Sequence, residues 1–351
     1  MTFGFPWRKL GSTEFIDGDK TMRPLISPAM NLKRRDMLLL AAATAAPTSL
    51  LAAPEYPDKP IRIVVPFVAG GGGDIVSRYM AQALSGPLGQ PVIVENYGGA
   101  GGLVGVNIGL AAPPNGSTLI FISSSYTVNP SLYKLKYDPV RDITPLAQMT
   151  AGPLLVVVNP KLPVKSMADL AALARSKPGQ VTYASSGQGS ALHLAAAQFA
   201  RQARVEMLHV PYKGGGAALI DVLNGTVDVY FAATGSAIPH VQSGKLRAIA
   251  VTTNPRLSLL PDVPTVAESG YPGYDVTLWY GLIGPKGMPP AVVSRINAEV
   301  NKVLSLPATA EKFQAEGVVP AAETPAIFGR RIEREIAQWR ETVGALGIKP
   351  E

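Results

Sequence analysis

The same order of short segments occurs twice in this chain of 351 residues, and this repeat constrains the fold more than any other feature. The first copy reads IRIVVPF, AGGGGD, IVSRYMAQAL, PVIVEN, GGAGG, a helix-like stretch, Asn115-Gly116 and STLIFIS; the second reads VTYASS, GQGS, ALHLAAAQFARQA, VEMLHVP, KGGG, AALIDVL, Asn224-Gly225 and TVDVYFAA. The two glycine loops are 28 residues apart in the first copy (Gly70 to Gly98) and 27 in the second (Gly187 to Gly214). Alternating strand and helix patterns of this kind predict parallel α/β units, here in two similar α/β domains.

Each glycine loop precedes a predicted helix, so its backbone N–H groups lie at a helix N-terminus. The loop AGGGGD lacks the GK[ST] ending of a nucleotide-binding P-loop, and its glycines do not fit G-x-G-x-x-G. Helix N-termini still attract anions, and open parallel sheets bind ligands beyond the carboxyl ends of their strands. The stretch PFVAGGGGD therefore predicts half of a clamp for a small organic anion in a cleft between the domains.

Composition excludes several other classes of protein. Hydrophobic residues make up 47% and charged residues 16%, which is enough for large cores. Of the net charge of +7, residues 1–53 carry +3, and the remaining +4 is spread without a basic block, so we expect no nucleic-acid partner. The chain has no cysteine, and its three histidines (His193, His209 and His240) lack metal-ligand spacing, so we expect neither a metal site nor a cofactor.

Residues 1–53 have the features of an N-terminal extension and a signal peptide. The basic run Lys33–Arg35 precedes an apolar run from Met37 to Ala46, and small residues follow up to Ala53. Twin-arginine export is an alternative route suggested by the arginine pair. The apolar run is shorter than the roughly 20 residues that a membrane anchor needs. The pattern favours Met30 as the true start and predicts a soluble, exported protein.

Candidate catalytic groups are few, and each has a structural interpretation. Ser186, Ser190 and His193 lie close together in SSGQGSALH, but Ser190 is in position to cap the following helix, with His193 in its first turn. Asp74 either complements a helix dipole or contacts the ligand directly. Tyr126, Tyr212, Trp279 and Tyr280 have polar tips that suit a pocket, although any of them could belong to the core.

The ordered set of motifs resembles one family closely. From about Tyr56 to the C-terminus, the chain is similar to the substrate-binding proteins of tripartite tricarboxylate transporters, the Bug-type extracytoplasmic solute receptors. The motifs that carry this resemblance are PFVAGGGGDIVSR, PVIVENYGGAGG, NGSTLIF, NPSLYKLKYDPVRDITPLAQM, YASSGQGSALHL, VPYKGGGAALIDVLNGTVDVYF, GKLRAIAVTT and LPDVPTVAESGYPGYDV.

The resemblance implies a type II periplasmic-binding-protein fold with a ligand cleft between two α/β domains. Domain 1 would combine residues 54–155 and 276–351, domain 2 would span 156–275, and the crossings would lie at 154–160 and 274–285. It also implies a periplasmic monomer that is not an enzyme. This receptor would bind a small organic carboxylate and deliver it to the membrane subunits of a tripartite tricarboxylate transporter.

In this family, backbone groups of two glycine loops and bridging waters hold the carboxylate. The resemblance thus places the ligand at Phe67, Ala69, Gly70, Gly71, Gly72 and Asp74, and at Ser186, Gly187, Ser190 and His193, and we add Tyr126 and Tyr212. Two positions depart from the family pattern: Gly73 replaces a threonine, and Ala232 replaces an aspartate after Phe231. Both changes affect which carboxylate is bound.

Three other functions are alternatives. A transferase or hydrolase on the same fold would need a convergent acid, base or nucleophile set, and only His193 with two serines is available. A regulator would need a DNA-binding helix-turn-helix, where the chain has a signal peptide instead. A ligand sensor that feeds a signalling system has the same sequence features as a transport receptor.

Overall fold

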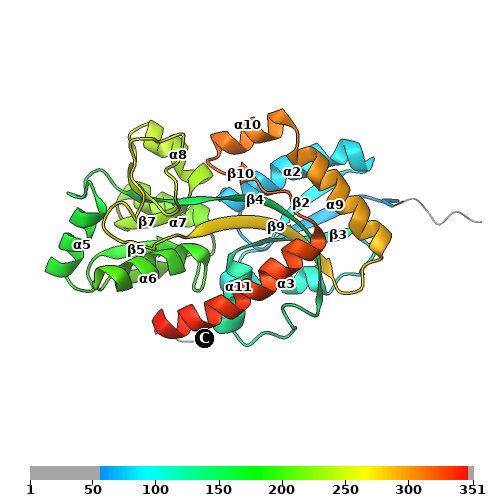
Figure 1. The fold of residues 1–351 in the computed structure, drawn as a ribbon, viewed down its shortest axis with the longest axis horizontal. Coiled ribbons are helices and arrows are strands. Elements are labelled where there is room, and N and C mark those ends of the chain that lie inside the picture. The colour runs from blue at the N-terminus through cyan, green and yellow to red at the C-terminus, as the bar shows by residue number, and fades with distance from the viewer. Residues whose placement is uncertain (1–55, 347–351) are drawn as a thin grey trace, which may run out of the picture. The chain divides into compact units, whose positions relative to one another are not determined.

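One mixed sheet runs through the computed structural model, which describes residues 56–346 (Figure 1). The strand order is β2-β1-β3-β9-β4-β7-β5-β6, and β8 and β10 also pair with β4. The strands are β1 (Ile61–Val65), β2 (Val92–Asn96), β3 (Thr118–Ser123), β4 (Ile143–Val158), β5 (Thr182–Ser185), β6 (Leu208–Pro211), β7 (Val229–Ala233), β8 (Arg247–Val251), β9 (Thr277–Pro285) and β10 (Val319–Pro320). The predicted signal peptide lies outside the described residues.

The predicted repeat is confirmed by the strand pairing. In the first copy, β1 pairs in parallel with β2 and β3, and β3 pairs antiparallel with β9. In the second copy, β5 pairs in parallel with β6 and β7, and β7 pairs antiparallel with β4. We call the parts built on these two copies the first and the second domain. Each therefore presents the carboxyl ends of its parallel strands, with their glycine loops, to one edge.

Strand β4 joins the two domains. Its residues 143–153 pair with β9 in the first domain, whereas 154–158 pair with β7 and β8 in the second. The chain returns through Val276, whose N–H bonds to the carbonyl oxygen of Thr252, and continues into β9. Both predicted crossing segments thus lie where the chain passes between domains. The described residues 56–346 pack as one unit, so the exact domain boundaries stay a prediction.

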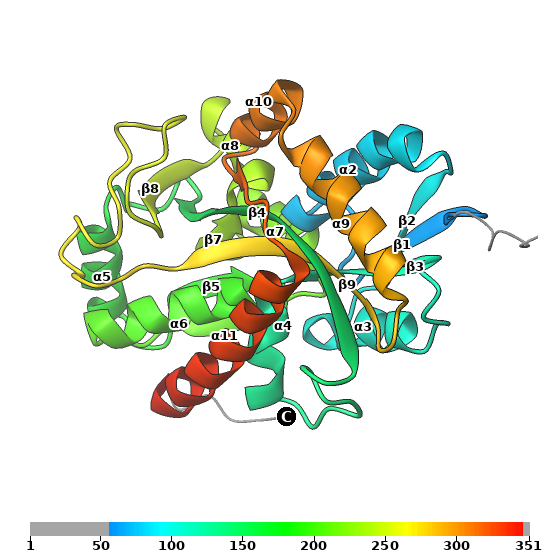
Figure 2. The same ribbon diagram turned by 45° about the vertical axis from the view of Figure 1, so that its right-hand side comes forward.

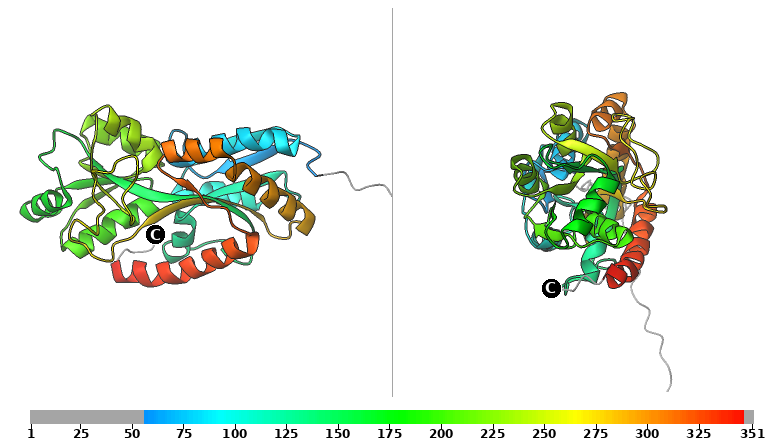
Figure 3. Two further views of the ribbon diagram at one scale, coloured as in Figure 1. Left: turned by 45° about the horizontal axis from the view of Figure 1, so that its top comes forward. Right: turned by 90° about the vertical axis from the view of Figure 1, so that its left-hand side faces the viewer.

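Helices cover both faces of the sheet. In the first domain, α2 and α9 lie on one face and α3 and α11 on the other (Figures 2 and 3). None of the helices within residues 56–346 is long and apolar enough to cross a membrane. The helices are α2 (Gly72–Leu88), η1 (Ala100–Gly102), α3 (Leu103–Leu110), α4 (Ser125–Val128), η2 (Asn129–Ser131), α5 (Met167–Ser176), α6 (Ala191–Ala203), α7 (Gly215–Asn224), α8 (Thr234–Gln242), α9 (Pro290–Leu304), α10 (Pro307–Ala315) and α11 (Pro325–Leu346).

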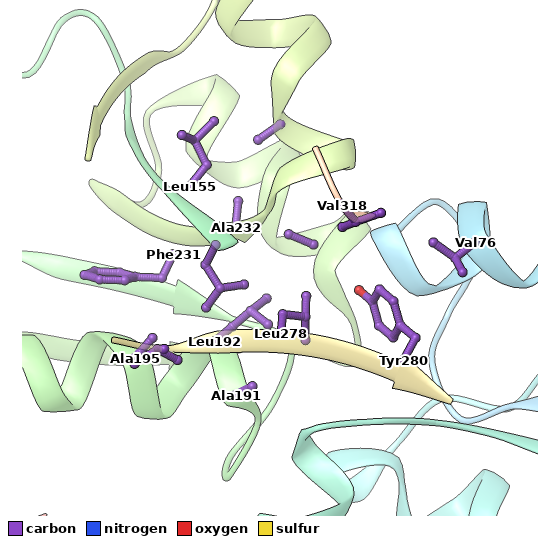
Figure 4. Close-up of a cluster of buried hydrophobic side chains, with 14 of the residues drawn as sticks. Val76, Leu155, Ala191, Leu192, Ala195, Phe231, Ala232, Leu278, Tyr280 and Val318 are labelled. Carbon is purple, nitrogen blue, oxygen red and sulfur yellow. The ribbon is translucent and has the colours of Figure 1, made fainter. Parts of the chain in front are cut away.

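The hydrophobic core is continuous across the crossing strands. Leu278 and Tyr280 of β9 lie between Leu192 of α6 and Val76 of α2, and all four side chains are buried (Figure 4). Burial of one such side chain contributes about 1.5–3 kcal/mol. The shared core therefore stabilises the arrangement in which the glycine loops of the two domains face each other.

Candidate functional site

Three adjoining cavities lie where the loops of the two domains meet. The largest, about 200 Å³, is lined by the segments that follow β1, β2, β5 and β6, all of them parallel strands. A second of about 30 Å³ lies at the N-termini of α2 and α7, and a third of about 10 Å³ lies beside Tyr126. Phe67 lines all three, and Ser186 lines the first two. This is the position at which open parallel sheets bind ligands.

The loop after β1 is held in shape by Asp74. Its carboxylate accepts hydrogen bonds from the N–H of Gly70 at 3.1 Å, from Arg78 Nε at 3.0 Å and from Asn96 Nδ2 at 3.0 Å. Asn96 Nδ2 also donates to the carbonyl oxygen of Phe67 at 3.1 Å. Burial alone would raise the pKa of Asp74, but these hydrogen bonds outweigh it and the pKa lies below its ordinary value. Asp74 thus lines the second cavity, and its carboxylate stabilises the conformation of the loop.

The helix N-termini at the second cavity present unpaired N–H groups. Helix α2 begins at Gly72 after Gly71, and α7 begins at Gly215. Within residues 56–346, the N–H groups of Gly72, Gly73 and Gly215 donate to no protein group, as expected for a first helical turn. A Cβ atom placed on Gly71 would lie 3.7 Å from the nitrogen atom of Gly215, so the two termini come close together. Together they favour an anion.

Ala69 and Gly70 lie at the rim of the cleft, outside the walls of these cavities. Both are exposed, and the loop from the second domain approaches them closely. A Cβ atom placed on Gly216 would lie 3.0 Å from the carbonyl oxygen of Ala69. These two predicted residues therefore contact the opposite domain in this structure.

The second glycine loop divides the predicted residues into two groups. Ser186 and Gly187 line the largest cavity. Ser190 is fully buried and accepts a hydrogen bond from the N–H of His193 at 3.2 Å, which confirms that it caps α6. His193 is also buried, and its Nδ1 accepts from the N–H of Gly189 at 3.1 Å. Ser190 and His193 thus lie behind the loop rather than on the cavity wall.

Both predicted tyrosines line cavities, but their hydroxyl groups bond to the protein. The hydroxyl of Tyr126 donates to the carbonyl oxygen of Pro139 at 2.8 Å. The hydroxyl of Tyr212 donates to the carboxylate of Asp221, and burial together with that carboxylate raises the pKa of Tyr212 to about 12. Each tyrosine therefore lines its cavity mainly with the aromatic ring, because its hydroxyl group is bonded to the protein.

Several lining residues were missed by the sequence prediction. The segment Gly99–Gly102 and Lys213 line the largest cavity, and Ser125 and Tyr230 line the second. The motifs GGAGG and KGGG occupy matched places in the repeat, and they are the sequence signal that could have identified Gly99–Gly102 and Lys213. Tyr230 comes from a buried strand with no comparable pattern, and Tyr280, which the sequence left open between pocket and core, also lines the second cavity. Among the described residues that line the three cavities, Lys213 has the one cationic side chain.

The two departures from the family pattern lie in different surroundings. Gly73 lines the second cavity, where a Cβ atom would lie 3.1 Å from the ring of Phe121. Ala232 is fully buried in the apolar core, and its neighbour Ala233 lines the cavity instead (Figure 4). Within residues 56–346, no cluster of three His, Cys, Asp or Glu side chains could hold a metal ion.

Two α/β domains, linked by crossing strands and closed over a cavity at their strand ends, define a solute-binding protein with the type II periplasmic-binding-protein fold. Residues 76–348 match the sequence model described as "Tripartite tricarboxylate transporter family receptor". The chain belongs to this family of solute-binding receptors, which are not enzymes, so the predicted family is confirmed and the enzyme alternative is wrong.

Curated and structural relatives agree with this assignment. Protein BugT of Bordetella pertussis is 35% identical over 316 residues, covering 89% of this chain and 96% of BugT. The solved structure of R. palustris Rpa4515 with adipate has a TM-score of 0.82 at 32% identity, covering 85% of this chain and all of Rpa4515. MatC from Rhodopseudomonas palustris with bound malate has a TM-score of 0.77 at 30% identity, covering 82% of this chain and all of MatC.

Proposed function

We propose that this protein captures a small organic carboxylate in the periplasm and delivers it to the membrane subunits of a tripartite tricarboxylate transporter. The observation that carries the proposal is the approach of the N-termini of α2 and α7 across one cavity, with their N–H groups unpaired. Such termini favour a carboxylate without an arginine. Family membership and the adipate and malate in the relatives' structures support the same ligand class.

The cavity dimensions favour a compact ligand. The largest of the three adjoining cavities, at about 200 Å³, is below the roughly 300–1,000 Å³ of typical small-molecule pockets. It adjoins the helix N-termini through Phe67 and Ser186, which line both cavities, and Lys213 also lines it. A dicarboxylate of a few carbon atoms would place one carboxylate at Gly72 and direct the other toward Lys213.

A thermal-shift screen tests the ligand class. The purified protein is heated with malate, adipate, citrate and the dimethyl esters of malate and adipate, which keep the carbon skeleton and remove the charges. A carboxylate at 100 times its dissociation constant should stabilise the fold by about 2.7 kcal/mol, and its ester should not. Equal shifts with acid and ester, or no shift with any acid, would overturn the proposed carboxylate class.

Delivery to a transporter needs a separate experiment. Uptake of the bound carboxylate is measured in cells that lack this receptor and in cells that carry it on a plasmid. We expect uptake at low external concentration only with the receptor. Unchanged uptake, with a transcriptional response that depends on the receptor, would favour the ligand-sensor alternative.

A further inference from the structure

Two stacked histidines support the second glycine loop from behind. The rings of His193 on α6 and His209 on β6 are 3.9 Å apart and almost parallel, at 10°. The ring of Tyr183 on β5 lies beside the pair, 5.0 Å from the ring of His209 and 6.1 Å from that of His193. In front of this stack run Ser186, Gly187 and Gln188, which line the largest cavity. The histidines therefore lie one layer behind the ligand-binding wall.

The contact of His193 fixes where its proton is. The N–H of Gly189 donates to Nδ1 of His193 at 3.1 Å, so Nδ1 must be unprotonated. The hydrogen-bond network thus assigns His193 as the neutral form with its proton on Nε2. Protonation of Nδ1 would place an N–H group against the N–H of Gly189 and break this contact.

The direction of the hydrogen bond between His209 and Ser185 follows from the single proton of the serine hydroxyl. Ser185 Oγ donates to the carbonyl oxygen of Gly187 at 3.0 Å and accepts from the N–H of Gly187 at 3.1 Å. It also lies 2.6 Å from Nε2 of His209. A hydroxyl has one proton and two acceptor sites, so all three bonds form when His209 donates from Nε2. His209 thereby anchors Ser185, which holds both backbone groups of Gly187.

Among the described residues, no charged side chain contacts either ring of the pair. The titratable groups in contact are the two histidines and Tyr183, and the polar group is Ser185. Within residues 56–346, neither histidine has an ion-pair partner. A positive charge on either ring would be buried without compensation, which is unfavourable.

We propose that His193 and His209 are positioning residues, which hold the Gly187–Gly189 loop in its ligand-binding shape only while both rings are neutral. The inference rests on the proposed carboxylate-binding function. It predicts that acid releases the loop by protonating His193. It also predicts that the loop shape depends on the hydrogen bonds of His193 with Gly189 and of His209 with Ser185, and not on aromatic packing alone.

Matched variants separate these contacts from packing. His193→Ala removes the acceptor for Gly189, whereas His193→Asn keeps an oxygen acceptor near the position of Nδ1 and cannot titrate. His209→Ala removes the donor to Ser185, whereas His209→Gln keeps a donor near the position of Nε2. His240→Asn, in the last turn of α8, is the control because His240 lines none of the three cavities.

The first readout needs no ligand. Amide hydrogen exchange of Gly187 and Gly189 is measured by NMR in the free protein, together with the ¹⁵N shifts of the histidine rings. We expect the Nε2–H form of both rings at pH 7. Exchange should become about tenfold faster or more at Gly189 in His193→Ala, and at Gly187, which His209 holds through Ser185, in His209→Ala. The Asn and Gln variants should restore most of the protection. An Nδ1–H form of His193, or unchanged exchange in His193→Ala, would overturn the proposal.

The second readout connects the loop to binding. Dissociation constants for malate and adipate are measured by calorimetry at pH 7 and pH 4.5. Each alanine variant should bind the probe about tenfold more weakly at pH 7, and the Asn and Gln variants should recover most of this loss. Burial lowers the pKa of His193 to about 3, so between pH 7 and 4.5 the wild type, His240→Asn and His193→Asn should lose equal affinity, and this loss reports protonation of the probe itself.

The outcomes keep the two proposals distinct. If neither malate nor adipate binds the wild type, the proposed ligand class loses its support, and the exchange data still decide on the histidines. If a probe binds the wild type and His193→Ala with equal affinity, the positioning role is wrong and the binding function stands. Equal affinity losses in His193→Asn and His193→Ala would also contradict the role of the Nδ1 acceptor.

Discussion

The hydroxyl of Tyr133 donates a hydrogen bond of 2.9 Å to the carbonyl oxygen of Gln188, and this bond crosses the cleft from the first domain to the second. The N–H of Ala191 donates in the opposite direction, to Ser125 Oγ at 3.0 Å. Next to them, Leu132 and Leu194 bury their side chains in one interdomain cluster. The structure is therefore the closed form of a two-domain receptor, and these contacts stabilise closure.

Removal of the Tyr133 hydroxyl should favour the open form. Tyr133→Phe keeps the ring and leaves the carbonyl group of Gln188 without this donor, so we expect affinity for malate or adipate to fall by about 0.5–1.5 kcal/mol. Calorimetry measures the affinity, and small-angle scattering should show a larger radius of gyration in the free variant. Tyr97→Phe is the control, since the Tyr97 hydroxyl bonds to Glu95 within the first domain. Equal affinity in both variants would contradict the role of this bond.

A side chain at Gly71 should block the anion site. Gly71 has φ −89° and ψ 168°, which a valine adopts readily, so Gly71→Val should fold. Its side chain would extend into the space between Gly71 and the N–H groups of Gly215 and Gly216. We expect carboxylate binding to weaken by more than about 100-fold, or 2.7 kcal/mol, with a nearly unchanged melting temperature.

Gly86→Val in the same helix is the matched control for that experiment. A Cβ atom at Gly86 meets nothing within 4 Å, and Gly86 is remote from the cavity walls. This variant should keep the wild-type dissociation constant. If Gly71→Val also keeps it, the loop is only a turn and the anion binds elsewhere.

Ser190→Ala should affect stability rather than affinity. Ser190 caps α6 and lines none of the three cavities, so its loss should lower the free energy of unfolding by about 0.5–2 kcal/mol. Ser166→Ala, which removes the cap of α5, should cost a similar amount. Chemical denaturation and calorimetry on both variants check this. A large affinity loss in Ser190→Ala alone would show that its hydroxyl acts on the ligand.

The histidine pair should make the fold sensitive to acid. Burial lowers the pKa of His193, with a further contribution from His209, to about 3, and burial lowers the pKa of His209 to about 4. The unfolded chain takes up protons near pH 6.5 and the folded chain does not, so stability falls as the pH falls through this window. Each histidine should contribute up to about 1.4 kcal/mol per pH unit between pH 6 and 4.5.

Denaturation at pH 7, 6, 5 and 4.5 measures this slope. The double variant His193→Asn, His209→Gln should lose most of it, and His240→Asn should retain it. A wild-type slope near zero above pH 4.5 would contradict the neutral state of the pair. Carboxyl groups titrate alike in the wild type and the double variant, so the difference between the two slopes reports the histidines.

The sequence predicts the loops of the site better than the side chains around them. The repeat locates AGGGGD and GQGS because, in a parallel α/β domain, a glycine loop between a strand and the next helix lies at the carboxyl edge of the sheet. The spacing of Ser190 before α6 likewise predicts a helix cap. These features depend on neighbours within a few residues along the chain.

Features that depend on distant partners could not be predicted in this way. His193 turns behind the loop because it stacks on His209, which lies on a different strand. Asp74 bonds to Asn96 of β2 as well as to its own helix, so neither sequence interpretation of Asp74 was complete. Tyr230 and Tyr280 occupy ordinary buried strand positions, and only the packing of the two domains brings them to a cavity.

The most direct test of the central claim is a crystal structure of the protein with malate or adipate, whichever binds more tightly, at pH 7. We expect a carboxylate between the N-termini of α2 and α7, with an oxygen atom about 2.7–3.2 Å from the backbone nitrogen of Gly72, Gly73 or Gly215. The loop at Ser186 and Gly187 should contact the same molecule. A carboxylate bound with no contact to either helix N-terminus would mean that these termini are not the anion site.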